Sequence, residues 1–144
     1  MRLALPLIRE GAAAPLFFLP AIDGAVRTLE GWNLLVFHGR DERYLAVVEA
    51  RTEALAGLGC TPFAVGRAAA LSPVSFPRLS DPDGAVARSY GAWADVPVLG
   101  GRVVPSVVLV NPARKVRLAN RGTPSVDAIV RTIQALQQAT RAKM

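Results

Sequence analysis

The chain has 144 residues, of which 51% are hydrophobic and 19% are charged; this composition excludes an intrinsically disordered protein and suffices for one domain with its own core. The formal net charge is +6, but most basic residues are arginines scattered among acids. The one acid-free basic segment, residues 100–122, matches no nucleic-acid-binding motif, so we expect a solvated basic surface and no nucleic-acid partner.

Cysteine and histidine each occur once, as Cys60 and His38. This excludes an internal disulfide, a CxxC redox pair and a zinc site built from several cysteines or histidines, so we expect no metal and no cofactor. The apolar N-terminus is interrupted by Arg9 and Glu10, and no run approaches the length of a membrane span. We therefore expect a single domain over residues 1–144 in a cytoplasmic protein that does not contact a membrane.

The first elements in chain order are an extended lead-in over residues 11–20 and a hairpin turn at Asp23-Gly24. A buried strand begins at Trp32, and the pattern then predicts one helix over residues 41–58, capped by Asp41. A second strand opens at Cys60, and a strand–helix–strand unit implies parallel strands. Pro62 removes a ladder donor, which predicts an edge strand or one that begins after the proline.

The second half of the chain alternates short helices and strands. We expect one or two helical turns within residues 66–76, an extended segment over 76–81, and a helix from Pro82 to about Gly91 or Trp93. Residues 95–105 read as a loop, residues 105–110 and 115–120 as an antiparallel hairpin, and a last helix follows Thr123-Pro124. This order predicts an α/β protein with a thioredoxin-like fold, a central mixed sheet flanked by helices.

Three segments resemble the peroxiredoxin-like AhpC/TSA family of the thioredoxin superfamily. Residues 11–24 are similar to the family's N-terminal G-x-x-A-P-x-F-x-L-P…D-G, residues 79–91 to its L-S-D-x-x-G-x-V-A-x-x-Y-G, and residues 105–111 to its P-[ST]-x-x-L-I-D strand. The resemblance implies a peroxiredoxin-type N-terminal extension and an antioxidant oxidoreductase that uses a cysteine thiolate.

The catalytic segment departs from the family pattern. Family peroxidases carry a P-x-x-x-[TS]-x-x-C turn, and laying it on this chain puts the cysteine at Ala46, with the following glutamate kept as Glu49. The family's arginine falls near Pro105, and Arg102 is the one substitute close by. Pro105 itself matches the superfamily's cis-proline beside the active site. The crossover before Asp81 is also about eight residues short. The resemblance therefore implies a degenerate site at Ala46, Glu49 and Pro105.

Cys60 is expected at the far end of the sheet, because a helix over residues 41–58 would carry the chain roughly 27 Å away from the turn. A small buried hydrophobe is therefore the favoured interpretation of this residue. We favour a non-catalytic binding or scaffold module. The alternative is a thiol-dependent oxidoreductase that uses Cys60 or a thiol from a partner.

The loop from His38 to Tyr44 is the expected binding site, since it follows the carboxyl end of a strand. An anion or a carboxylate-bearing protein partner could be recognised there, unless Asp41 and Glu42 already neutralise the loop. The candidate ligand contacts are His38, Arg40, Arg43, Tyr44 and Arg102. A homodimer is a second expectation, with the apolar loops over residues 96–101 and 71–77 as its contact surfaces.

Overall fold

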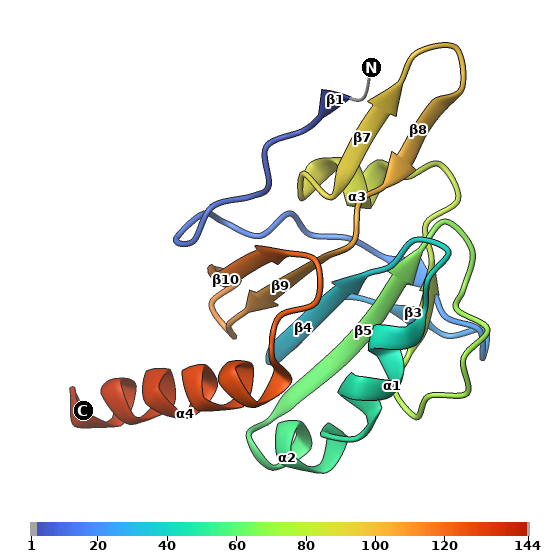
Figure 1. Cartoon of the computed structure of the whole chain (residues 1–144). Coiled ribbons are helices and arrows are strands. Elements are labelled where there is room, and N and C mark those ends of the chain that lie inside the picture. The colour runs from blue at the N-terminus through green and yellow to red at the C-terminus, as the bar shows by residue number, and fades with distance from the viewer. Residues whose placement is uncertain (1–2, 144) are drawn as a thin grey trace.

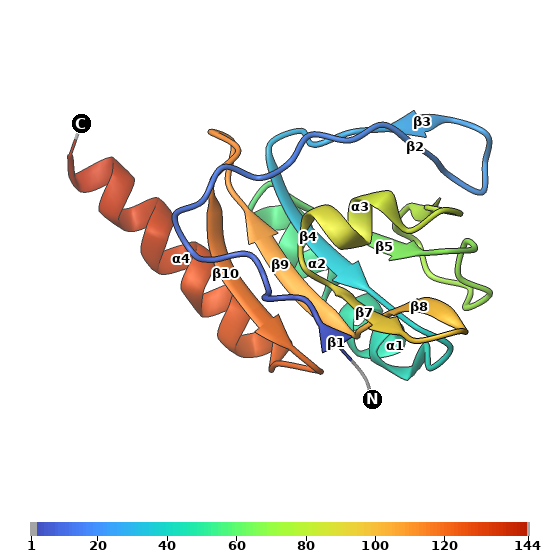
Figure 2. The same cartoon turned by 90° about the horizontal axis from the view of Figure 1, so that it is seen from above.

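The computed structural model of the protein describes residues 3–143, and its centre is a five-stranded mixed sheet with the strand order β10-β9-β4-β5-β6 (Figure 1). In chain order the strands of this sheet are β4 (Trp32–Phe37), β5 (Cys60–Gly66), β6 (Arg78–Ser80), β9 (Ser106–Val110) and β10 (Val116–Arg121). Helices cover one face, and the N-terminal segment with a short helix covers the other (Figure 2).

β4 and β5 are parallel as predicted, with Trp32 opposite Cys60 and Phe37 opposite Val65. β9 and β10 form the predicted antiparallel hairpin, and β9 also pairs antiparallel with β4. Both alternatives predicted from Pro62 are wrong, because β5 lies between β4 and β6 and already begins at Cys60. Pro62 is nevertheless tolerated, because β6 pairs only with residues 64–66 and leaves the first half of β5 without a neighbour on that side.

The predicted helix over residues 41–58 is in fact two short helices, α1 (Arg43–Glu49) and α2 (Thr52–Gly57). Arg51 leaves helical geometry with φ −120° and ψ 13°. The Thr52 hydroxyl donates to the Glu49 carbonyl at 2.9 Å, a carbonyl that an unbroken helix would use. Asp41 is not the N-cap as predicted; Glu42 holds that position, and Asp41 instead accepts a hydrogen bond from the Arg43 amide at 3.0 Å.

Residues 95–105 were predicted as a loop, but they contribute to a second, three-stranded sheet. It consists of β1 (Leu3–Ala4), β7 (Trp93–Val96) and β8 (Gly100–Val103) in the order β1-β7-β8. Gly101 serves packing here, because a Cβ at this position would lie 2.2 Å from the Trp93 indole. Gly101 is therefore required by the Trp93 side chain that packs over it, whereas Gly100 has open space around it and a positive φ of 83°.

The predicted Asp23-Gly24 hairpin is confirmed by β2 (Leu19–Pro20) and β3 (Val26–Arg27), which pair antiparallel. The other helices begin later than predicted. α3 (Ala85–Ser89) begins three residues after Pro82, and the Asp81 carboxylate accepts from the Val86 and Ala87 amides. α4 (Val126–Ala142) has Ser125 as its N-cap, which accepts from the Ala128 amide at 3.2 Å.

The connection from β5 to β6, residues 67–77, contains no helix, although a turn or two was predicted within it. Two carboxylates from the α1 region hold this connection in place. Glu42 accepts hydrogen bonds from the Leu71 amide, the Ser72 amide and the Ser72 hydroxyl at 2.7–3.1 Å. Glu49 accepts from the amide and hydroxyl of Ser75 at 3.0 and 2.9 Å. The crossover between two parallel strands usually contains a helix that packs on the sheet. Here the hydrogen bonds to these two carboxylates hold the connection in place instead.

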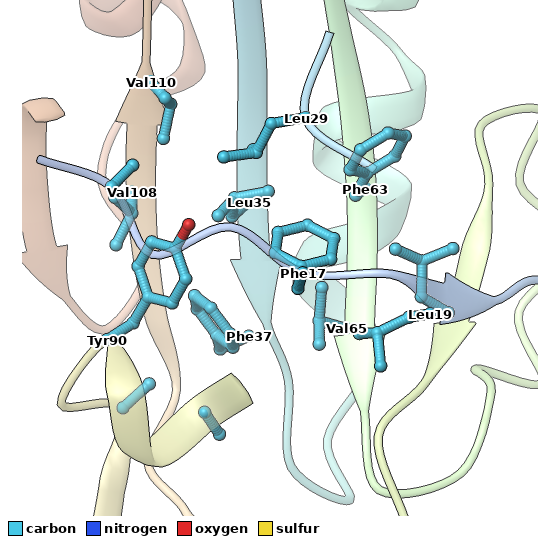
Figure 3. Close-up of a cluster of buried hydrophobic side chains, with 14 of the residues drawn as sticks. Phe17, Leu19, Leu29, Leu35, Phe37, Phe63, Val65, Tyr90, Val108 and Val110 are labelled. Atoms are coloured by element: carbon cyan, nitrogen blue, oxygen red, sulfur yellow. The ribbon is translucent and has the colours of Figure 1, made fainter. Parts of the chain in front are cut away.

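The core has two parts, one on each face of the central sheet. One lies under α1, α2 and α4 and includes Leu45, Leu55 and Ile133. The other joins the N-terminal segment to α3, and Figure 3 shows Phe17 between Phe37 and Phe63. Tyr90 packs edge-on against Phe17 with ring centroids 6.4 Å apart, and its hydroxyl donates to a carbonyl of the lead-in. The first two segments of the family resemblance thus pack against each other.

Candidate functional site

A hollow of about 680 Å³ lies at the carboxyl end of β4, where α1 and α4 begin. We call it the β4 hollow. Its walls come from the end of β4, the start of α1, the turn before β9 and the residues that lead into α4. They are Val36, Phe37, His38, Asp41, Arg43, Tyr44, Leu45, Val47, Pro105, Gly122, Thr123, Pro124 and Ser125. The hollow therefore lies where ligands bind in open α/β sheets.

His38 is buried directly after β4, with only 6% of its surface exposed. Its Nδ1 atom lies 3.0 Å from the Gly39 carbonyl, so a proton on Nδ1 can be donated there. Its Nε2 atom is buried and has no hydrogen-bond partner among residues 3–143. The ring lies over Gly66, where a Cβ would come within 2.4 Å of the imidazole. His38 is thus held by packing against β5 and has a free ring nitrogen.

Arg43 lines the hollow, but its charge is already paired. Its guanidinium contacts the Asp41 carboxylate at 2.6–3.1 Å, and hydrogen bonds from Arg43 lower the pKa of Asp41 to about 2. Arg40 and Arg102 are exposed and do not line the hollow. Of the three predicted arginine contacts, the structure brings one to the hollow, and Asp41 neutralises it.

Tyr44 also lines the hollow and links its two sides. Its hydroxyl donates to the Pro124 carbonyl at 2.6 Å, and burial raises the pKa of the phenol to about 12. This bond joins the start of α1 to the residues before α4. Tyr44 therefore fixes the shape of the hollow as a neutral donor, and it cannot supply a phenolate near neutral pH.

The residues aligned with the family's catalytic positions have separate surroundings. Ala46 is exposed on α1 and does not line the hollow. The Glu49 carboxylate is bonded to Ser75. Pro105 does line the hollow, but no cis peptide bond occurs between residues 3 and 143, so it differs from the superfamily's cis-proline. Of these three aligned positions, Pro105 alone lines the hollow.

Cys60 lies at the opposite end of the sheet from the β4 hollow, as predicted. It pairs with Trp32, the first residue of β4, whereas the hollow follows the last. The five residue steps between these pairs span roughly 16 Å at the usual rise of a strand. Cys60 is 2% exposed, and burial raises the pKa of its thiol to about 12. A thiol in such surroundings is a poor nucleophile.

Sequence reasoning did not find the contributions of Val47 and of residues 122–125 to the hollow. Val47 is 52% exposed on α1, and Pro124 carries the carbonyl that Tyr44 bonds. The one sequence signal there is the Thr123-Pro124 pair, which predicts a helix start but no contact with the end of β4. Most of the exposed wall surface is apolar, and Thr123 and Ser125, just before α4, add polar groups to those of the residues 38–44 described above.

No three metal-ligating side chains gather anywhere in residues 3–143. Over the same residues, none of the helices is long and apolar enough to cross a bilayer.

The chain matches no known protein-family model, and no curated protein sequence is significantly similar to it. Its structure is similar to the peroxidoxin BcpB of Mycobacterium tuberculosis (TM-score 0.77, 18% identity, covering 89% of this chain and 97% of that one). It is also similar to thioredoxin peroxidase I of Plasmodium yoelii (TM-score 0.76, 16% identity, 92% and 93% covered). A third similar structure is the bacterioferritin comigratory protein of Xanthomonas campestris (TM-score 0.73, 19% identity, 89% and 98% covered). The predicted resemblance is confirmed for the fold: this chain has the peroxiredoxin form of the thioredoxin-like fold.

Proposed function

We propose that this protein is a degenerate peroxiredoxin-like binding module that acts in the cytoplasm and does not reduce peroxides. One observation carries the proposal: the chain's single thiol is buried, has a raised pKa and lies far from the hollow. Cys60 is 2% exposed with a pKa raised to about 12, and it lies at the far end of β4 from the hollow. Peroxide reduction requires an accessible thiolate.

The β4 hollow supports the binding role. Its volume of about 680 Å³ is in the range of small-molecule sites, and its walls combine apolar side chains with a few polar groups. Because Asp41 pairs with Arg43, the ligand needs no large negative charge. An apolar body against Val47, Pro105 and Pro124 fits this lining best.

A peroxide-consumption assay with thiol reductant tests the catalytic alternative. We expect no turnover above the protein-free rate for the wild type or for Cys60→Ser. Thiol-dependent turnover that disappears in Cys60→Ser would overturn the proposal. Turnover retained in Cys60→Ser but dependent on a partner's thiol would overturn it as well.

An environment-sensitive apolar dye, anilinonaphthalene sulfonate, tests the binding role. We expect it to bind the native protein, and we expect Val47→Glu to weaken binding because a charge would enter the apolar wall. Ala50→Glu is a matched control, since it adds the same charge at an exposed position just beyond α1, outside the hollow. Equal binding by both variants, or none by the wild type, would contradict this role.

Self-association would make the module a scaffold. Val98 and Leu99 at the β7–β8 turn and Leu71 in the crossover are 104%, 82% and 87% exposed, which supports the two predicted contact loops. We expect Leu71→Asp or Leu99→Asp to reduce the molar mass measured by light scattering at high concentration. A wild-type monomer under those conditions would remove the scaffold role.

A further inference from the structure

β10 is an edge strand of the central sheet, and most of its outer edge is open. β9 pairs with one side of it. On the other side the N-terminal segment reaches only the start of the strand, through the Ala13–Lys115 bridge and two bonds to Val116. The Gly122 amide bonds the Pro105 carbonyl of the β9 side at 2.8 Å. By the alternation of an antiparallel ladder, the backbone groups of Ala119 and Arg121 therefore point outward.

A groove of about 570 Å³ follows this open edge, between residues 7–10, β10 and α4. We call it the β10 groove. Its walls include Leu7, Arg9, Arg117, Ala119, Thr132 and Leu136. Figure 1 shows the N-terminal segment above β10 and α4 below it. An extended peptide could lie here and pair with the strand, because a sheet edge offers unpaired backbone donors and acceptors.

The charges around the groove select for an acidic occupant. Residues 7–10, β10 and α4 contain two carboxylates, of which Asp127 is paired with Arg51 at 2.7 Å. The other, Glu10, lines the groove, so its single negative charge stands against the positive charges of three arginines, Arg9, Arg117 and Arg121. Arg9 and Arg117 line the groove, and neither forms an ion pair within residues 3–143. The Arg121 guanidinium donates to the carbonyls of Gly91 and Leu5, which carry no charge to offset its own.

The same arginines disfavour a second copy of this chain as the occupant. Two β10 edges paired antiparallel about Ala119 would put Arg117 of each copy opposite Arg121 of the other. Like charges directly opposite each other destabilise a strand pair. The carboxylates of an acidic strand would instead lie opposite Arg117 and Arg121 and stabilise the strand pair.

We propose that the β10 groove binds an extended, acidic segment of a partner protein, which adds to the central sheet as a further strand beside β10. The backbone of Ala119 and Arg121 pairs with that segment, and its carboxylates lie near Arg9 and Arg117. This surface is separate from the β4 hollow, so the proposal does not depend on what the hollow binds.

A synthetic probe tests this assignment. The probe is a fluorescein-labelled eight-residue peptide that alternates glutamate and valine, used beside one in which lysine replaces every glutamate. A third peptide keeps the glutamates but carries N-methyl groups on alternate backbone amides, which blocks strand pairing and leaves the charge unchanged. We expect binding by the acidic peptide alone. We also expect slower hydrogen exchange of the Ala119 and Arg121 amides when it is bound.

Charge-reversal variants locate the contact. Arg117→Glu should weaken binding of the acidic peptide about tenfold, and Arg9→Glu should do the same from the other wall. Arg141→Glu is the matched control, since it makes the same charge change outside the groove. Circular dichroism checks that each variant is folded. If Arg117→Glu does not fold, Arg9→Glu still tests the contact.

Four results would overturn the proposal. They are no binding of the acidic peptide at low salt, equal binding of its N-methylated form, an equal loss in Arg141→Glu, or a wild-type dimer that Arg117→Glu changes. The last result would identify the edge as a contact between copies.

Discussion

Glu42 is the residue through which the helix-free crossover can be tested most directly. Its carboxylate accepts hydrogen bonds from three donors on residues 71 and 72. Burial raises its pKa, but the hydrogen bonds from Ser72 and Leu71 outweigh this effect, and the net result is a lowered pKa. The ionised carboxylate is therefore the form that stabilises the fold.

The magnitude follows from the number and type of these bonds. A hydrogen bond to a charged group contributes about 1.5–3 kcal/mol when buried, and partial exposure of the loop reduces that. We expect Glu42→Ala to lower the free energy of unfolding by about 2–3 kcal/mol, since three donors lose one acceptor. Glu42→Gln should lower the free energy of unfolding by roughly 1 kcal/mol. The amide oxygen of glutamine still accepts a hydrogen bond, but its NH₂ group would face other donors.

Urea denaturation at neutral pH measures these changes. Glu53→Ala is the control: Glu53 is exposed on α2 and forms no side-chain hydrogen bond in the described part of the chain, so its loss should cost below about 0.5 kcal/mol. A lowered folded-state pKa contributes stability above the unfolded pKa, near the usual value of 4.5, and loses it as the pH falls further. The difference between wild type and Glu42→Gln should therefore be constant from pH 6 to 8 and shrink below about pH 4.5.

Two results would refute this reasoning. One is a Glu42→Ala variant as stable as Glu53→Ala, which would mean that the crossover does not need the carboxylate. The other is a wild-type advantage that grows on acidification, which would mean that the neutral acid is the stabilising form.

Three further predictions concern the thiol, the β5 glycine and the hollow. Cys60 should not react with Ellman's reagent at pH 8 until urea unfolds the protein, because burial raises its pKa to about 12; rapid native reaction would contradict the burial argument. Gly66→Ala should lower the free energy of unfolding by about 1–3 kcal/mol, since its Cβ would meet the His38 ring at 2.4 Å, and an unchanged urea midpoint would contradict that contact. Tyr44→Phe should lower the free energy of unfolding by about 1 kcal/mol, because the hydrogen bond to the Pro124 carbonyl is lost. Ultraviolet titration of the wild type should show a phenol with a pKa of about 12 that the variant lacks.

The sequence predicted the parallel β4–β5 pair, the two hairpins at residues 19–27 and 106–121, and the position of Cys60. Each of these rests on a local signal, such as a buried apolar run or a turn dipeptide, that agrees with the final fold. The last helix predicted after Thr123-Pro124 is likewise present as α4, which buries Val126, Ile129 and Ile133.

Two errors occur where side-chain contacts decide the local structure. The break between α1 and α2 coincides with Arg51, which pairs with Asp127 of α4, a partner that no local window contains. The β7–β8 hairpin is local in sequence, but it depends on the Trp93 ring filling the space at Gly101. Propensity alone does not include that packing, so the pattern predicted a loop.

The surroundings of the candidate site could be foreseen from the sequence only in part. The loop after β4 does border a hollow, yet the ion pair that removes Arg43 as an anion contact was expected only as an alternative. The wall formed by residues 122–125 comes from a segment about 80 residues further along the chain, and its place depends on how α4 packs.

The burial of Cys60 has a consequence for how the protein responds to oxidants. Sulfenic acids and mixed disulfides form at accessible, ionised thiols, and this sulfur is neither accessible nor ionised at neutral pH. Hydrogen peroxide or oxidised glutathione should therefore leave the folded chain without a cysteine adduct. A chain with a peroxiredoxin-like fold would then carry its one cysteine unchanged under reducing and oxidising conditions alike.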